Sequence, residues 1–181
     1  EDVADPSAAF HGLIKADHAA SRARGIGDPE VDIVEIWRRF FAQCANAKFD
    51  DETVRMLAAE YECVVNPVWP YPELVETLVA LKSAGLPLGI VSNAQFYTPL
   101  MLEAFTGFSL AESGFDERLL VWSFEHHLGK PSVELYREQA RRLQETRGIA
   151  PGKCLYVGND MLKDVWAAAE IGFQTVLFAG D

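Results

Sequence analysis

The sequence of 181 residues carries a formal net charge of −11, and 49% of its residues are hydrophobic. This charge argues against a surface for nucleic acid or an anionic membrane, but it leaves room for a local basic pocket that binds a small anion. No apolar run approaches the ~20 residues of a membrane helix, and three cysteines without metal-ligand spacing are typical of reduced thiols. We therefore expect a cytoplasmic protein with a packed core, and the sequence does not indicate its oligomeric state.

Residues 1–68 carry apolar side chains at helical spacing in three segments. The first segment spans Ala8 to Arg22. The second is predicted to open at Asp28-Pro29-Glu30, where a capping acid precedes a proline in the first turn. The third begins around Asp51 and carries Val54, Leu57, Tyr61 and Val64 on one face. Because helices this short need one another's apolar faces, residues 1–68 are predicted to form a small antiparallel bundle.

Residues 69–181 have a different pattern, which begins after the two prolines of Trp69-Pro70-Tyr71-Pro72. Short apolar strands are predicted at 88–91, 119–122, 155–157 and 175–178, and helical segments separate them. Pro131 is predicted to open one of these helices, which ends near Gly148. This alternation predicts an α/β domain with a Rossmann-like parallel sheet.

Polar residues follow three of the predicted strands: Ser92 and Asn93, then the loop that leads to Lys130, then Asp160 and Asp164. The carboxyl ends of parallel strands share one edge of a sheet, so these residues can converge. Two carboxylates there repel each other unless a cation lies near them, and all-oxygen ligands suit Mg²⁺. A hydroxyl, an amide, an ammonium and a carboxylate-bound Mg²⁺ together form a site for phosphoryl chemistry.

Each of these positions also has a structural interpretation. Ser92 and Asn93 can cap the helix that follows them. Lys130 can be a solvated surface charge, and Asp164 can compensate the dipole of the helix in whose first turn it is predicted to lie. The order and spacing of the three segments favour the functional interpretation.

These segments resemble the second, third and fourth motifs of the haloacid dehalogenase superfamily. The matching residues are Ser92-Asn93, Ser123 to Pro131 with Lys130 before the proline, and Gly158 to Asp164. The resemblance extends from Tyr71 to Gly180, and it implies that residues 69–181 are the α/β core and residues 1–68 an α-helical cap subdomain. It further implies a Mg²⁺-dependent phosphatase that hydrolyses a small phosphorylated metabolite through an aspartyl-phosphate.

The resemblance also implies a role for each residue. Ser92 would hydrogen-bond the phosphoryl oxygens with Asn93 beside it, and Lys130 would neutralise the charge of the nucleophile and the phosphoryl group. Asp160 would bind Mg²⁺ and Asp164 would support the metal's ligand shell. Many members have an aspartate directly after the glycine, where this chain has Asn159, so the metal role can be divided differently between Asn159 and Asp160.

The family's first motif, a strand that ends in a nucleophilic aspartate with a second aspartate two residues later, is expected before the cap. Asp2 and Asp5 have the wrong spacing and no strand before them. Three explanations remain open: the segment was removed or not recorded, another chain supplies it, or the protein never had it. We favour the first, which makes this the core without its first, central strand.

Two other functions remain as alternatives. A related dehalogenase would attack a carbon–halogen bond with the same nucleophile, and a catalytically inactive member of the superfamily would bind a ligand through the same cleft. The paired acids Asp160 and Asp164 favour a metal and therefore phosphate.

Overall fold

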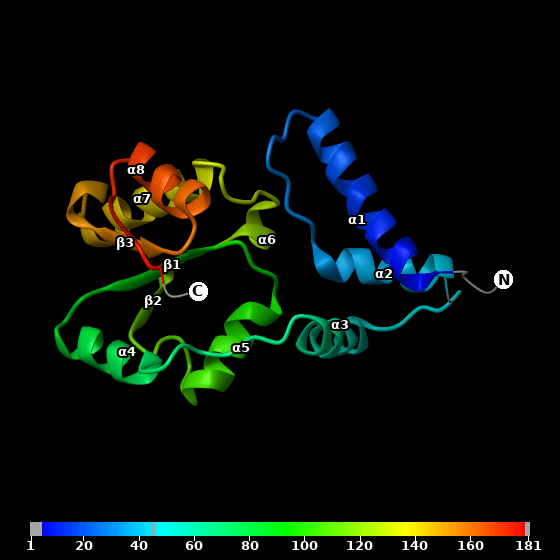
Figure 1. The fold of residues 1–181 in the computed structure, drawn as a ribbon, viewed down its shortest axis with the longest axis horizontal. Helices are drawn as coiled ribbons and strands as arrows, with labels where there is room; N and C mark the ends of the chain where they lie inside the picture. Colours follow the sequence, from blue (N-terminus) through cyan, green and yellow to red (C-terminus); the bar gives the residue numbers. More distant parts are fainter. Residues whose placement is uncertain (1–4, 45, 180–181) are drawn as a thin grey trace. The chain divides into compact units, whose positions relative to one another are not determined.

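The computed structural model describes residues 5–44 and 46–179. Contacts between residues divide the chain into two compact units, one that ends at Pro70 and a second that begins at Tyr71 (Figure 1). This division lies close to the boundary expected between residues 68 and 69. Within the described residues, no helix is both long enough and apolar enough to cross a membrane.

The first unit is helical and consists of α1 (Pro6–Ala23), α2 (Ile33–Cys44) and α3 (Asp51–Val65). Helix α2 packs against both α1 and α3. Trp37 of α2 is buried among aromatic rings, with its ring centroid 4.5 Å from that of Phe10 and 5.1 Å from that of Tyr61. The prediction of three helices is confirmed, and aromatic packing on α2 holds them together.

An aspartate precedes each of these helices, and the capping acid predicted for the second helix is the wrong one. The Asp5 side chain accepts a hydrogen bond from the Ala8 backbone N–H at 3.0 Å, which caps α1. The predicted start of the second helix at Asp28 is wrong. Helix α2 begins only at Ile33, because the Asp32 side chain accepts a hydrogen bond from the Val34 N–H at 2.9 Å. Asp2 lies outside the described residues.

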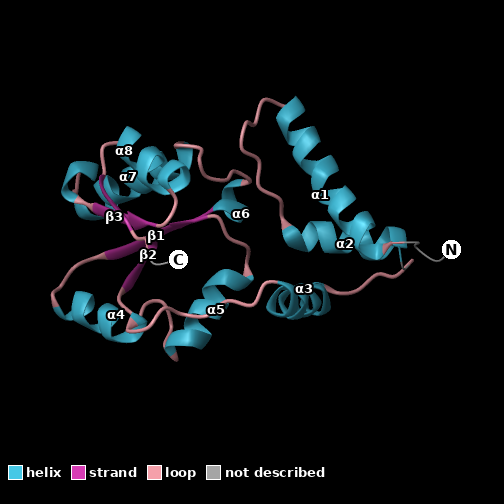
Figure 2. Cartoon of the chain, viewed as in Figure 1, coloured by secondary structure: helices cyan, strands magenta, loops and turns pink. Residues whose placement is uncertain are grey.

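The second unit, which we call the core unit, alternates helices and strands as predicted (Figure 2). Its elements are α4 (Leu74–Ser83), β1 (Leu88–Ser92), α5 (Tyr97–Thr106), β2 (Phe115–Trp122), α6 (Ser123–His126), α7 (Glu134–Arg147), the 3₁₀ helix η1 (Pro151–Lys153), β3 (Leu155–Gly158), the π-helix η2 (Met161–Trp166), α8 (Ala167–Glu170) and β4 (Gln174–Leu177). Helix α7 does not begin at Pro131. The Ser132 N–H donates to the Gly129 carbonyl at 3.1 Å, so this segment forms a turn before the helix.

The strands pair in parallel, as predicted, but the described strands form two pairs and not one continuous sheet. Strand β1 pairs with β2, with Val91 opposite Val121, and β3 pairs with β4, with Gly158 opposite Leu177. No backbone ladder joins β1 to β3 in the described part of the chain. Each of these two strands therefore keeps one edge without a strand partner.

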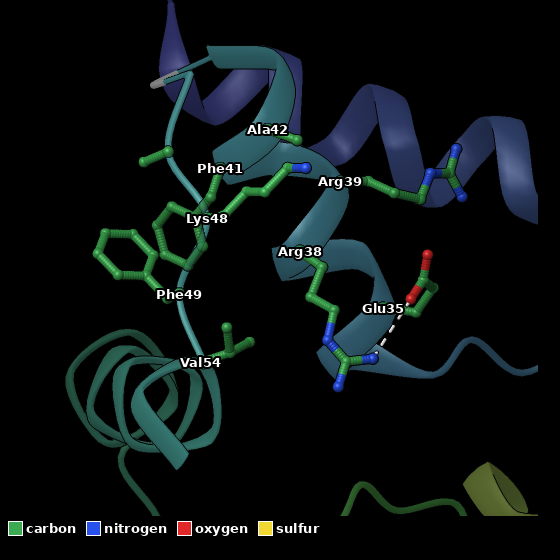
Figure 3. A pocket seen from close by; sticks show the side chains of 9 residues that line it. Glu35, Arg38, Arg39, Phe41, Ala42, Lys48, Phe49 and Val54 are labelled. Atoms are coloured by element: carbon green, nitrogen blue, oxygen red, sulfur yellow. Dashed lines mark ion pairs between the residues drawn. The ribbon is translucent and has the colours of Figure 1, made fainter. Parts of the chain in front are cut away.

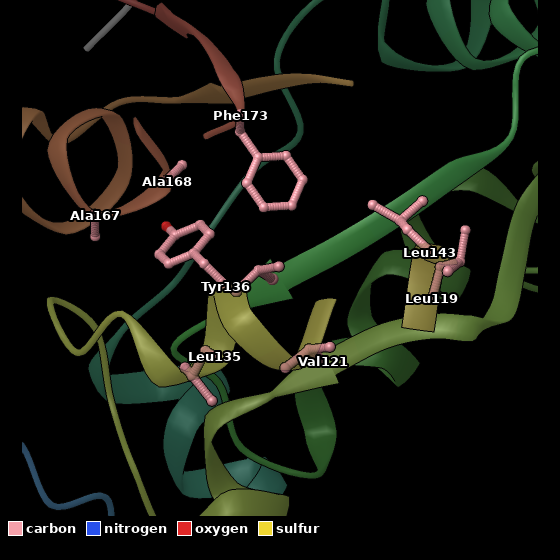
Figure 4. Packing of buried hydrophobic residues seen from close by; sticks show 9 residues of the cluster. Leu119, Val121, Leu135, Tyr136, Leu143, Ala167, Ala168 and Phe173 are labelled. Carbon is pink, nitrogen blue, oxygen red and sulfur yellow. The ribbon is translucent and has the colours of Figure 1, made fainter. Parts of the chain in front are cut away.

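Helices cover both sides of the strands, with α7 and α8 on one side and α4 and α5 on the other (Figure 1). Side chains of β1 and β2 alternate between the two sides, as the two-residue period of a strand requires. Val91, Leu119 and Val121 pack with α7 and α8 (Figure 4), whereas Ile90, Leu120 and Trp122 pack in a second cluster. This layered packing fixes the carboxyl ends of the strands, where the polar residues lie.

Candidate functional site

A polar cavity of about 500 Å³ lies at the carboxyl ends of β1 and β3. It contains all of the predicted site residues together with two more, and its lining consists of Ser92, Asn93, Lys130, Asn159, Asp160, Lys163 and Asp164. Residues that are far apart in the sequence therefore share one cavity. The grouping agrees with the expectation that parallel strands present their carboxyl ends at one edge.

Ser92 and Asn93 form the end of β1, and Asn93 joins this end to the loop that carries Lys130. The Asn93 side-chain amide donates to the Lys130 carbonyl at 3.2 Å, and the Lys130 N–H donates to Asn93 Oδ1 at 2.7 Å. The N-cap of α5 is Phe96 and makes no side-chain capping hydrogen bond. Neither Ser92 nor Asn93 caps that helix, so the structural alternative for these two residues does not hold.

Asp164 is the centre of the site's hydrogen-bond network and is only 3% exposed. Its Oδ1 lies 2.5 Å from Lys130 Nζ, and its Oδ2 accepts from the backbone N–H groups of Asn159 and Asp160 at 3.1 and 3.0 Å. Burial opposes ionisation of this carboxyl, but the hydrogen bond and the charge of Lys130 outweigh it and hold the pKa of Asp164 below its ordinary value. Asp164 is thus a buried anion and not a surface charge that compensates a helix dipole.

Gly158 makes room for this network. A Cβ at position 158 would lie 2.3 Å from the Asp164 Cβ, which is closer than two such atoms can approach. The glycine that ends β3 therefore allows Asp164 to reach back to the backbone of residues 159 and 160.

Two tyrosines complete the network, and the sequence did not single them out. The hydroxyls of Tyr136 and Tyr156 lie 3.3 and 3.2 Å from Asp164 Oδ1. Tyr136 also donates to the Lys163 carbonyl at 2.8 Å, and Tyr156 donates to the Val91 carbonyl at 3.0 Å. Burial raises the pKa of both tyrosines, so their hydroxyls stay protonated and act as donors. Their positions in apolar patterns gave no signal of this role.

Asp160 differs from Asp164 because only one of its two carboxylate oxygens accepts hydrogen bonds from the described residues. Asp160 Oδ1 accepts from the N–H groups of Leu162 and Lys163 at 2.9 and 2.8 Å and so caps η2. Its Oδ2 lies 3.8 Å from the Nζ of Lys163, a half-exposed cation that the sequence interpretation did not include. A lysine three residues after Asp160 was the signal that could have identified it.

The hydrogen bonds of Asp160 and Asp164 indicate which of the two carboxylates can bind a metal ion. In the described ranges, no three His, Cys, Asp or Glu side chains come together as a metal-binding group. Both oxygens of Asp164 are occupied by hydrogen bonds, so this residue fits the supporting role and not that of a direct ligand. Asp160 Oδ2 fits a direct ligand, and Mg²⁺ needs only one or two carboxylates when water and phosphate fill its other positions.

Comparison with known proteins shows the family of this chain. A family model described as haloacid dehalogenase-like hydrolase matches residues 7–172. A glyceraldehyde 3-phosphate phosphatase of Methanocaldococcus jannaschii is 32% identical over 107 residues, which are 59% of this chain and 43% of that protein. An (S)-2-haloacid dehalogenase of Pseudomonas putida is 27% identical over 75% of this chain and 53% of its own length. The chain thus spans about half the length of the curated relatives it matches.

A solved structure has a similar fold. The crystal structure of a HAD phosphatase from Thermococcus onnurineus superposes with a TM-score of 0.56 at 22% identity. The superposition covers 97% of this chain and 78% of that one. At this level of identity, the similarity establishes the fold alone.

Proposed function

Since this chain belongs to the haloacid dehalogenase-like hydrolases, we propose that it forms part of a Mg²⁺-dependent phosphatase for a small phosphorylated metabolite. The observation that carries this proposal is the polar cavity in which Lys130 is held by the buried Asp164. A fixed cation beside hydroxyl and amide groups stabilises charge on a phosphoryl group without reorganisation during the reaction.

Each residue of the polar cavity would have its own role in the reaction. Ser92 and Lys130 would bind the phosphoryl oxygens, and Asn93 would hold the Lys130 loop against the end of β1 through its two hydrogen bonds. Asp164 would position Lys130, whose Nζ also lies 3.4 Å from the Val91 carbonyl. Asp160 would hold Mg²⁺ through Oδ2, and the bound ion would neutralise charge on the phosphoryl oxygens.

The reaction also needs a nucleophilic carboxylate, which the family resemblance implies on a strand upstream of this chain. The free edges of β1 and β3 support a strand between them, because each described strand is paired on one side only. A cavity of about 90 Å³ is lined by residues of both strands, Val91 and Tyr156 among them. A parallel strand in this position would end beside Lys130.

The test is release of phosphate from p-nitrophenyl phosphate by the protein extended upstream with that strand. We expect turnover that needs Mg²⁺ and that Asp160→Ala abolishes, whereas Glu117→Ala, which removes an exposed acid of β2, leaves turnover unchanged. Turnover that persists in Asp160→Ala or without Mg²⁺ would contradict the proposal. An extended protein that binds phosphate without turnover would instead support a binding protein.

A dehalogenase is the second candidate, and one observation favours it. A relative that is 27% identical over 138 residues is named as an (S)-2-haloacid dehalogenase. Chloride release from (S)-2-chloropropionate in the presence of a chelator, by the same extended protein, distinguishes this reaction from the phosphatase reaction.

A further inference from the structure

The helical unit contains a cavity of its own, of about 340 Å³, between α2 and the loop that precedes α3 (Figure 3). This volume falls within the range of about 300–1,000 Å³ that is common for small-molecule sites. The cavity is lined by Glu35, Arg38, Arg39, Phe41, Ala42, Ala47, Lys48, Phe49 and Val54. All of these residues belong to the helical unit, so the cavity shares no residue with the polar cavity of the core unit.

The loop that forms one wall is anchored at both ends. The Ala47 N–H donates to the Phe41 carbonyl at 3.1 Å, and Asp50 caps α3 by accepting from the Thr53 N–H at 2.8 Å. Lys48 and Phe49 lie between these anchors. The Phe49 ring packs edge-on against Phe41 with centroids 4.9 Å apart, yet Phe49 remains 45% exposed. The wall therefore presents aromatic surface that the chain itself does not cover.

The charges around this cavity are compensated with one exception. Arg38 pairs with Glu35 at 3.5 Å and also with Asp51, and Arg39 pairs with Asp17 at 3.2 Å. Lys48 has no ion-pair partner within the described part of the chain, and it lines the cavity together with Phe41 (Figure 3). The cavity thus combines one uncompensated cation with an apolar, aromatic surface.

We propose that this cavity binds a small amphipathic monoanion, namely a carboxylate that carries a flat aryl group. The ammonium of Lys48 would pair with the carboxylate, and Phe41, Phe49 and Val54 would contact the aryl group. A single negative charge matches the one uncompensated cation, because Arg38, Arg39 and Glu35 are already paired. The site is independent of the phosphatase reaction proposed above.

The experiment is calorimetric titration of this chain with 3-phenylpropionate and with its neutral amide. We expect the acid to bind at least about tenfold more tightly than the amide, because only the acid forms a charge-assisted hydrogen bond with Lys48. Lys48→Gln should remove this preference, and Phe49→Ala should weaken both ligands. The matched control is Lys15→Gln, which removes an exposed lysine of α1 and should keep the preference.

Three results would overturn the proposal. One is the absence of saturable binding of 3-phenylpropionate to the wild type, and another is an undiminished preference for the acid in Lys48→Gln. The third is displacement of 3-phenylpropionate by inorganic phosphate, which would assign the binding to the polar cavity of the core unit. Because Lys48 is exposed, circular dichroism of Lys48→Gln should match the wild type and rule out misfolding as the cause.

Discussion

The two cavities each contain a lysine, but the two lysines are held in opposite ways. In the core unit, Lys130 Nζ lies 2.5 Å from Asp164 Oδ1, and the side chains of the pair are only 11% and 5% exposed. In the helical unit, Lys48 is exposed and has no ion-pair partner within the described residues. Lys130 neutralises the buried carboxylate of Asp164. Lys48 can pair with a ligand without breaking an existing ion pair.

The difference follows from the elements that hold each residue. Asp164 and Lys130 lie where the loop before α7, the end of β3 and η2 meet, and backbone N–H groups fix the carboxylate. Lys48 lies on a short loop that is held by hydrogen bonds at its two ends and by the packing of Phe49 on Phe41, with no ion pair to Lys48 in the described part of the chain. The core cavity is therefore preorganised for charge, and the helical cavity is not.

The largest expected effect comes from Asp164→Asn, which leaves the buried Lys130 without a counter-charge. Removing one partner of a buried ion pair costs about 3–5 kcal/mol of unfolding free energy, and urea denaturation of the variant measures it. The control is Asp160→Asn, because asparagine caps a helix as well as aspartate and the change should cost less than about 1 kcal/mol. Equal losses of unfolding free energy in the two variants would mean that the buried Asp164 is no more important for stability than the partly exposed Asp160.

The same pair predicts a dependence on pH. The pKa of Asp164 is lower in the folded protein than its ordinary value of 3.8, since Lys130 and the backbone N–H groups favour the carboxylate. A lowered pKa contributes stability above pH 3.8, and this contribution is lost as the pH falls through the folded-state pKa. The stability difference between wild type and Asp164→Asn should thus narrow below about pH 3.8. A difference that stays constant between pH 6 and pH 3, in urea titrations at each pH, would contradict this assignment.

The sequence predicted the grouping of Ser92, Asn93, Lys130, Asp160 and Asp164 because each follows a parallel strand, and strand ends share an edge. It could not predict which aspartate is buried. That depends on the approach of Tyr136 and Tyr156 to Asp164, and both tyrosines lie in apolar patterns that also describe ordinary core residues. Only the packing of α7 and β3 brings their hydroxyls to the carboxylate.

In the helical unit, the apolar periodicity predicted the third helix but not which of its residues are buried. It predicted Val64 on the apolar face of the third helix, but Val64 is 79% exposed. The buried face of α3 is the one with Val54 and Ala58. A stripe of apolar residues predicts that a helix forms. Which residues of the stripe are buried depends on the element that packs against the helix.

Tyr136→Phe should have an intermediate effect. The change keeps the ring, which is fully buried, but removes the hydroxyl that donates to the Lys163 carbonyl at 2.8 Å and approaches Asp164. Loss of this hydrogen bond should cost about 1 kcal/mol. Tyr61→Phe in the helical unit is the control, since Tyr61 is 37% exposed and the change should stay within about 0.5 kcal/mol. Hydrogen exchange of core-unit and helical-unit peptides reports the two effects separately, and protection unchanged by Tyr136→Phe would mean that the hydroxyl is not part of the network.

The smallest effect is expected for Lys48→Gln, which removes the lysine of the helical cavity. An exposed lysine without an ion pair contributes little to folding, so the unfolding free energy of the helical unit should change by less than about 0.5 kcal/mol. Lys130→Gln is the matched change in the core unit, and it should cost several times more because it leaves Asp164 as a buried anion without a cation. Hydrogen exchange of α2 and α3 peptides measures the first effect. If Lys48→Gln instead weakened these helices by more than about 1 kcal/mol, Lys48 would be as much a structural charge as Lys130, and it would not be free to pair with a ligand.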